Sequence, residues 1–158
     1  MIKKILRRFK VIFIDVYIYQ MLNYKPFSEV APNYNIDKSD LSDGKTCYFI
    51  KDSGKVVHKS FLFSKVFLLR SIKESGPVIG DCVTVKSHRG QSIYPYVINK
   101  IAKEVLEKDK KTVFIIVDKS NLSSIKGIEK AGFSKLASIV AKRWLWFYFK
   151  REIIYLNN

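Results

Sequence analysis

The chain has 158 residues, 47% hydrophobic and 14% aromatic, which suits one domain (1–158) with a single core of ordinary size. Its 29 Lys and Arg against 14 Asp and Glu leave a net charge of +15, so a polyanionic partner is expected: a nucleotide-bearing cofactor, an anionic membrane face or nucleic acid. No stretch approaches the roughly 18 consecutive apolar residues of a spanning helix, which argues against a chain that crosses a membrane.

The two cysteines, Cys47 and Cys82, form neither a metal-ligand spacing nor a disulfide framework. Each lies in an apolar run, so both are predicted to be small buried hydrophobes in a reducing cytoplasm. With only two histidines and no paired carboxylates, a catalytic metal is not expected.

Residues 1–10 form a basic lead to the apolar run 11–14, an order that imitates a signal peptide. Asp15 interrupts the run and no small-residue cleavage site follows, so a first strand is predicted at 10–19. The alternative interpretation is that the basic lead contacts anionic lipid, which would place a cytoplasmic protein at the inner face of the membrane.

Segment 20–45 is polar and contains Pro26, Pro32 and Gly44, which predicts an irregular connection or short helices. Apolar and β-branched runs then predict strands at 46–50, 55–63, 66–72 and 78–85. The first two of these strands form a hairpin, because Ser53 and Gly54 supply a turn between them.

Apolar residues at helical spacing predict a helix at 96–108 that packs on a sheet. A strand at 113–117, a short helix that ends before Gly132, and strands at 135–140 and 143–154 complete the predicted elements. Segment 142–151 interleaves basic and aromatic residues. Alternation along a strand explains this pattern, and a stacking platform for single-stranded nucleic acid is the less favoured alternative.

The most informative stretch is 83–95, where a β-branched run meets a small-residue loop that opens into the helical pattern. Amides from Gly90 to Tyr94 would leave the first helical turn without intrahelical partners, and with the positive end of the helix dipole they suit a pyrophosphate. Pro95 is tolerated in a first turn and marks the start of the helix.

These elements and their motifs resemble the GNAT superfamily of N-acetyltransferases, which acylate amines with acyl-coenzyme A. The pyrophosphate motif of that family falls on Arg89, Ser92 and Tyr94, and its second motif falls on Asn121, Ser124, Ile128, Lys130 and Gly132-Phe133. Ile128 stands where many members carry a tyrosine that protonates the leaving thiolate. The resemblance covers about 45–150.

A closer resemblance is to the GNAT-like proteins of bacterial surface-polysaccharide biosynthesis. It is carried by Ile93-Tyr94-Pro95 at the loop, by Val57-His58-Lys59-Ser60 on a predicted strand, and by Thr84 before the loop. This resemblance implies acetyl transfer to an amino sugar or a sugar-lipid precursor. A degenerate relative that binds coenzyme A without transferring, and a basic membrane-surface or nucleic-acid-binding module, remain as alternatives.

The resemblance implies an α/β (α+β) fold: a mixed, mostly antiparallel sheet with a central parallel pair splayed to admit acetyl-coenzyme A or another acyl-coenzyme A, and flanking helices. In the family a bulge in the strand before the loop, here 82–85, frees amides that bind the pantetheine arm. The residues expected to bind the cofactor are Val83, Val85, Arg89, Gly90, Gln91, Ser92, Ile93, Tyr94, Asn121 and Ser124. For two of them a structural role is the alternative: Arg89 could brace the loop, and Asn121 could cap a helix.

His58 is the first candidate for a general base, because an unperturbed histidine titrates near pH 6.5. Thr84 could hydrogen-bond the acceptor or the thioester, although both residues also suit purely structural roles on strands. Asp81 and Glu74 are the fallback bases, and His88 is expected to be exposed beside the loop.

Overall fold

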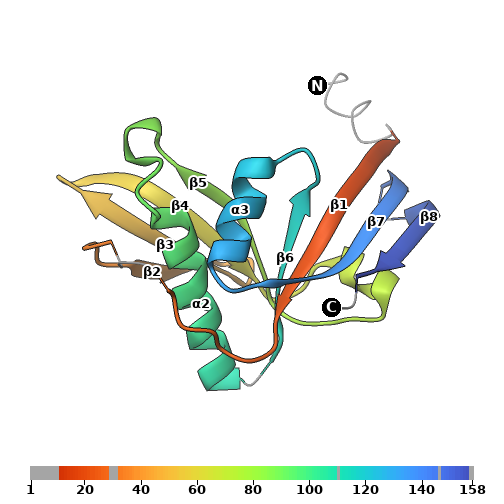
Figure 1. The fold of residues 1–158 in the computed structure, drawn as a ribbon, viewed down its shortest axis with the longest axis horizontal. Coiled ribbons are helices and arrows are strands. Elements are labelled where there is room, and N and C mark those ends of the chain that lie inside the picture. Colours follow the sequence, from red (N-terminus) through yellow and green to blue (C-terminus); the bar gives the residue numbers. More distant parts are fainter. Residues whose placement is uncertain (1–10, 29–31, 110, 146, 157–158) are drawn as a thin grey trace.

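The computed structural model describes residues 11–28, 32–109, 111–145 and 147–156, and the basic lead 1–10 lies outside them. Within these residues a mixed sheet carries two α-helices and two short 3-10 helices (Figure 1). The strands are β1 (Ile12–Met21), β2 (Asp37–Asp40), β3 (Lys45–Asp52), β4 (Lys55–Phe63), β5 (Val78–Thr84), β6 (Val113–Asp118), β7 (Ser134–Trp144) and β8 (Phe147–Tyr155). The helices are η1 (Phe67–Ile72), η2 (Lys86–His88), α2 (Ile93–Asp109) and α3 (Leu122–Lys130).

The strands follow the order β2-β3-β4-β5-β6-β1-β7-β8. Every neighbouring pair is antiparallel except β5 and β6, which are parallel, so the predicted mixed, mostly antiparallel sheet is confirmed. The strand predicted at the start of the chain is β1, and it is inserted in the middle of the sheet. Its Ile18 lies opposite Ile116 of β6 on one side and Ala137 of β7 on the other.

The parallel pair is splayed, as predicted. β5 and β6 pair only at Val78 with Phe114 and at Ile79 with Ile115, and beyond this point the two strands diverge (Figure 1). β5 meanwhile stays paired with β4 as far as Thr84. The register between β4 and β5 shifts between Lys59 and Phe61, which marks a bulge on this stretch, and Asp81 there has a φ of 48°, in the left-handed region.

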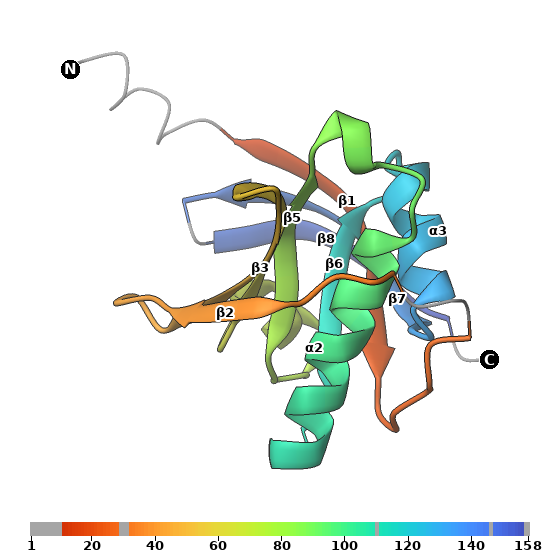
Figure 2. The same ribbon diagram turned by 90° about the vertical axis from the view of Figure 1, so that its left-hand side faces the viewer.

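Helices α2 and α3 lie beside each other over one face of the sheet, in contact with β4, β5 and β6 (Figures 1 and 2). The buried face of α2 supplies Val97, Ile98, Ile101, Ala102 and Val105, the helical spacing seen in the sequence. A second cluster covers β1 and β7, where Leu68, Leu69 and Ile72 of η1 pack on Ile18, Phe114 and Ile139.

Two predicted elements differ in type from the structure, and one boundary differs in position. The strand predicted at 135–140 is β7, which continues to Trp144, so Arg143, predicted as the first residue of the last strand, belongs to β7, and β8 begins at Phe147. The strand predicted at 66–72 is the 3-10 helix η1, because a short continuous apolar run has no period that separates a strand from a buried helical turn. Segment 20–45 was predicted as irregular or helical, but it contains β2, which pairs with β3 through Lys38 and Tyr48. All four residues of β2 are exposed, so its sequence lacks the alternation of apolar and polar residues from which a strand is predicted.

The β3–β4 hairpin is confirmed, and its turn is short. Asp52 pairs with Lys55, which leaves Ser53 and Gly54 as a two-residue loop with φ values of 49° and 76°. Positive φ at both positions is typical of a type I′ turn, which suits the twist of the two strands. This turn brings Asp52 to the edge of the site described next.

Candidate functional site

A cavity of about 540 Å³ lies where β5 leaves β6, bounded by the end of β5, the following loop, the start of α2 and the outer side of α3. Its lining residues are Cys82, Val83, Thr84, His88, Arg89, Gly90, Ser92, Ile93, Tyr94, Pro95, Asn121, Ser123, Ser124, Lys126, Gly127 and Lys130. The cavity therefore brings together most of the residues expected to bind the cofactor. Val85 and Gln91 are not in the lining, and Val85 donates its amide to the carbonyl of Val57.

The loop after β5 turns sharply into α2. Gly90 and Ser92 have φ values of 81° and 56°, and an added Cβ at Gly90 would meet no atom within 4 Å. Helix α2 begins at Ile93, so the first-turn amides of Ile93 and Tyr94 have no intrahelical acceptor. These amides and the positive end of the helix dipole lie at the cavity, and this is the arrangement that suits a phosphate.

Arg89 braces this loop. Its Nε atom donates a hydrogen bond to the carbonyl oxygen of Thr84 at 3.1 Å, so the structural alternative for Arg89 is present in the molecule. The residue also lines the cavity and carries a positive charge. The two roles are compatible, because a guanidinium has five N–H donors and this bond uses one of them.

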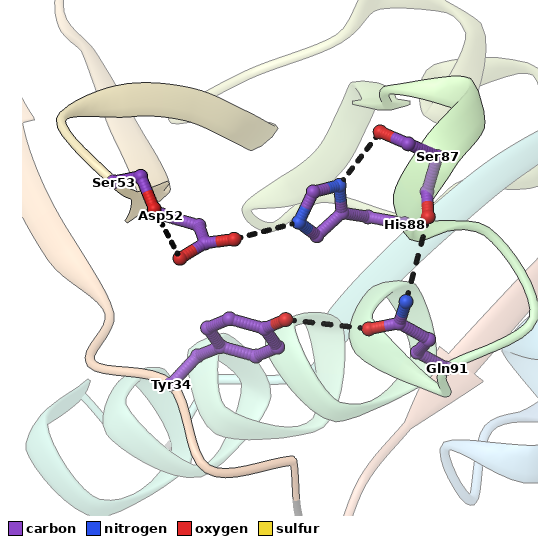
Figure 3. A network of polar contacts seen from close by, with 6 residues as sticks. All are labelled: Tyr34, Asp52, Ser53, Ser87, His88 and Gln91. Atoms are coloured by element: carbon purple, nitrogen blue, oxygen red, sulfur yellow. Dashed lines mark hydrogen bonds and ion pairs between the residues drawn. The ribbon is translucent and has the colours of Figure 1, made fainter.

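A polar network ties the loop to the end of β3 at Asp52 and to Tyr34 in the segment before β2 (Figure 3). His88 lies 3.0 Å from Asp52 through Nε2 and 2.9 Å from the Ser87 hydroxyl through Nδ1. Gln91 continues the network, because its amide nitrogen donates to the Ser87 carbonyl and its Oε1 accepts from the Tyr34 hydroxyl. The hydrogen bond from His88 lowers the pKa of the Asp52 carboxyl.

This network corrects the prediction for His88 and includes two residues that the sequence did not predict at the site. His88 is not simply exposed beside the loop, since only 17% of its side chain is accessible and Asp52 holds it. Sequence reasoning did not single out Asp52 or Tyr34. They lie 36 and 57 residues from the partners they contact, His88 and Gln91, and no local pattern links them.

His58 and Thr84 are brought together by strand register. They lie opposite each other on β4 and β5, so their side chains point to the same face of the sheet, as does Ser60 two residues further along β4. The Nδ1 atom of His58 is 2.8 Å from Oγ1 of Thr84, and its Nε2 atom is 2.8 Å from Oγ of Ser60. Both ring nitrogens therefore have hydroxyl partners.

Burial changes the chemistry of His58. The residue is 1% exposed, and desolvation lowers its pKa to about 4 rather than the value near 6.5 expected from sequence. His58 is neutral at pH 7 and does not line the cavity, whereas Thr84 does. Thr84 thus separates the imidazole from the cavity. The fallback bases Asp81 and Glu74 are also outside the lining.

The thiol and phenol at the cavity are both held in their neutral forms. Cys82 lies on β5 and donates to the carbonyl of Gly80, and burial raises the pKa of its thiol to about 12. Burial also raises the pKa of Tyr94, whose ring centroid is 6.4 Å from that of His58. Cys82 is therefore a packing residue rather than a thiolate nucleophile, and Tyr94 keeps its proton as a hydrogen-bond donor.

Helix α3 forms the second wall. Asn121 is its N-cap, since its Oδ1 accepts from the Ser124 amide at 3.2 Å and from the Ser123 hydroxyl at 3.1 Å. The cap expected from sequence is therefore confirmed. Lys130 donates to the Ser92 hydroxyl at 2.9 Å, which joins the end of α3 to the loop across the cavity. Lys126 is a cavity-lining cation that sequence reasoning did not single out.

Gly127 allows α3 to lie against the ring of Tyr94. A Cβ atom at this position would be 2.7 Å and 2.8 Å from two ring carbons of Tyr94. The next residue, Ile128, is fully buried and packs in the hydrophobic core. An isoleucine packed in the core therefore occupies the position at which the resemblance places a tyrosine.

Two classes of site receive no support within the described ranges. Among these residues no three His, Cys, Asp or Glu side chains are grouped so that they could hold a metal ion. No helix in the same part of the chain is long and apolar enough to cross a membrane.

Comparison with known proteins finds a similar solved structure. No protein-family model and no curated protein sequence matches the chain. A solved structure does: a GNAT-family acetyltransferase from Colwellia psychrerythraea, with 17% sequence identity, a TM-score of 0.57 and 88% of this chain covered. The chain spans little more than half of that protein, 57% of its length. The mixed, mostly antiparallel sheet with its parallel pair and flanking helices is therefore similar in fold to that protein and consistent with a GNAT fold.

Proposed function

We propose that the protein is an acyl-coenzyme A-dependent N-acyltransferase, with acetyl-coenzyme A as its donor. The observation that carries the proposal is the coincidence of three features at one cavity: the open edge of β5 beyond Ile79, the first turn of α2, and the hydroxyl of Thr84. A cofactor with a pyrophosphate and a long polar arm needs the first two features, and acyl transfer needs a polar group such as the third.

The residues present fit the donor. The pyrophosphate would bind at the first-turn amides of Ile93 and Tyr94, with the charges of Arg89 and Lys126 close by. β5 no longer pairs with β6 beyond Ile79, so its edge can take hydrogen bonds from the pantetheine arm. The acyl thioester supplies the activated carbonyl, and every other contribution comes from the chain itself.

In the transfer step the acceptor nitrogen forms a bond to the acyl carbon and the carbon–sulfur bond breaks. The nitrogen loses one proton and the departing thiolate gains one, so the proton balance closes without a further reactant. Thr84 is placed to relay that proton, because its hydroxyl is already hydrogen-bonded to the neutral imidazole of His58. Ser60 fixes the orientation of the imidazole. Tyr94, which stays protonated, can donate a hydrogen bond to the leaving sulfur.

For the acceptor we propose an amino sugar or a sugar-lipid precursor of a surface polysaccharide. The support is the resemblance of the His58 segment (57–60) and of the loop at 93–95 to GNAT-like proteins of that biosynthesis. The arrangement of Thr84 beside a buried histidine gives that resemblance a chemical use, because an amino group needs an acceptor for its proton.

A second candidate function is coenzyme A binding without transfer. Ile128, fully buried, leaves the leaving thiolate without the acid that many relatives supply there. The low pKa of His58 means that the imidazole does not keep a proton at neutral pH. Both observations argue against efficient proton transfer at this site, and neither affects the binding of the cofactor.

A thiol-release assay separates the two candidates. Acetyl-coenzyme A is incubated with free and nucleotide-linked amino sugars, with polyamines and with lysine peptides, and each acceptor has its N-acetylated form as the matched control. We expect release of free coenzyme A with amino sugars and none with the N-acetylated controls. Cofactor binding without release for any acceptor would overturn the transferase and favour the binding protein. Release only with peptides or polyamines would overturn the acceptor class alone.

A further inference from the structure

Exposed aromatic side chains gather on one corner of the sheet, away from the cavity. Phe13 of β1 is 63% exposed, Trp144 at the end of β7 is 40% exposed, and Phe147 and Phe149 of β8 are 59% and 38% exposed. Such a concentration of large apolar groups is typical of an interaction surface. We call these four residues the aromatic face.

Register places the four residues on the same side of the sheet. Phe13 lies opposite Lys142, Lys142 lies opposite Phe149, and Trp144 lies opposite Phe147. Residues opposite each other share a face, and Lys142 and Trp144 share one because they are two positions apart. The other side of these strands is already occupied, because η1 packs there in the second core cluster.

The aromatic face lies among positive charges. Between positions 142 and 151 the sequence carries Lys142, Arg143, Lys150 and Arg151 and no acidic residue; the first acid after them is Glu152. Lys142 lies on the side of the aromatic face, whereas Arg143, opposite Tyr148, lies on the other side. Strand β1 begins at the same corner, because its first residue, Ile12, pairs with Arg143. In the sequence the ten residues before Val11 carry Lys3, Lys4, Arg7, Arg8 and Lys10 and no acid.

We propose that the aromatic face docks on an anionic lipid bilayer. Phenylalanine and tryptophan rings partition into the boundary between headgroups and acyl chains, while neighbouring Lys and Arg bind the lipid phosphates. One corner of this sheet offers both groups together. A second copy of the chain fits the surface less well, because a two-fold contact would bring the same cations together. This proposal is independent of the proposed function.

Vesicle sedimentation with the full chain tests the proposal. Vesicles with about a third anionic lipid are compared with neutral ones at low salt, and bound protein is measured in the pellet. We expect binding to the anionic vesicles only, and a loss of at least about fivefold in Phe147→Ser/Phe149→Ser. Phe67→Ser is the matched control, since Phe67 on η1 is 58% exposed and η1 packs on the opposite side of the sheet.

Tryptophan emission keeps the proposal testable if the double variant fails to fold. The sequence has two tryptophans, Trp144 of the aromatic face and Trp146, two positions further along the chain. We expect a blue shift of the wild-type emission with anionic vesicles and none with neutral vesicles. The membrane assignment is overturned if the protein binds neither vesicle, or if the double variant still binds. It is also overturned if the protein binds single-stranded oligonucleotides more tightly than vesicles, or if it forms a dimer that the double variant destabilises.

Discussion

The Nδ1 atom of His58 lies 2.8 Å from Oγ1 of Thr84, across the pairing of β4 with β5. The two residues are 26 positions apart in the chain, and strand register alone makes them neighbours. Thr84 faces the cavity and His58 lies behind it, in the core. A neutral, buried imidazole is thereby coupled to a hydroxyl at the candidate site.

This burial predicts a pH dependence of stability. Unfolded His58 takes up a proton below about pH 6.5, whereas the folded residue does so only near pH 4, so the unfolded state binds more protons between these values. The free energy of unfolding should therefore be highest above pH 6.5 and fall by roughly 3 kcal/mol as the pH drops to about 4. Urea unfolding at a series of pH values measures this slope.

The slope should shrink in His58→Gln and persist in His88→Gln, which removes the other histidine of the chain. The carboxyls with lowered pKa values, including that of Asp52, begin to lower the free energy of unfolding only below about pH 5, so the slope between pH 6.5 and about 5 reports His58. A wild-type stability that is flat between pH 6.5 and 4 would mean that His58 is accessible to protons in the folded state.

The hydroxyl of Thr84 should matter more than its shape. Thr84→Val keeps the side-chain volume and the branching at Cβ that suits a strand, but it removes the hydrogen bond to His58. We expect turnover to fall at least about tenfold, with little change in cofactor affinity. Thr84→Ser keeps the hydroxyl and should retain most of the turnover. Equal rates in Thr84→Val and wild type would show that the hydroxyl takes no part.

The pH profile of turnover gives an independent check on the same pair. Because His58 has a pKa of about 4, a limb near neutrality must report deprotonation of the acceptor amine rather than of the imidazole. The limb should therefore persist in His58→Gln at a lower overall rate. If the limb disappears in that variant while the variant remains folded, His58 titrates near neutrality when the substrate is bound.

Gly127 should be intolerant of a side chain. Alanine normally favours a helix by about 1 kcal/mol over glycine, but here its Cβ would be 2.7 Å from the Tyr94 ring. Overpacking of this kind costs about 1–3 kcal/mol, so we expect a net loss of stability in Gly127→Ala. Lys126→Ala, exposed on the same helix, is the control. A Gly127→Ala protein more stable than wild type would show that Tyr94 can move aside freely.

The cap of α3 offers a simpler test. Asn121→Ala removes the acceptor for the Ser124 amide, and we expect it to lower the free energy of unfolding by about 0.5–2 kcal/mol. Asn121→Asp keeps an oxygen acceptor at the cap, a carboxylate oxygen in place of the amide oxygen, and should be close to wild type. Guanidinium unfolding of the three proteins measures the difference, and an unchanged Asn121→Ala protein would argue that the bond is unimportant.

Sequence patterns predicted the elements whose signals are local. The hairpin follows from Ser53 and Gly54, the start of α2 from the loop and Pro95, and the helix cap from Asn121. In each case the residue acts on backbone within a few positions, so the pattern and its consequence lie in the same short window.

What escaped prediction depends on partners distant in the chain. The place of β1 between β6 and β7, the exposed edge strand β2 and the helical form of η1 are set by tertiary packing. The same holds for His58: its type and strand could be identified, but its burial, its bonds to Thr84 and Ser60, and hence its low pKa come from the fold.

The central claim is that the cavity at the start of α2 binds the nucleotide-bearing donor, and direct titration calorimetry with coenzyme A tests it most plainly. We predict binding tighter than about 1 mM for the wild type. Ser92→Glu should weaken it at least about tenfold by placing a carboxylate beside the pyrophosphate, whereas Ser92→Gln, of matched size and uncharged, should bind nearly as well as wild type. Absence of binding at millimolar coenzyme A, or equal affinity in Ser92→Glu and wild type, would contradict the claim.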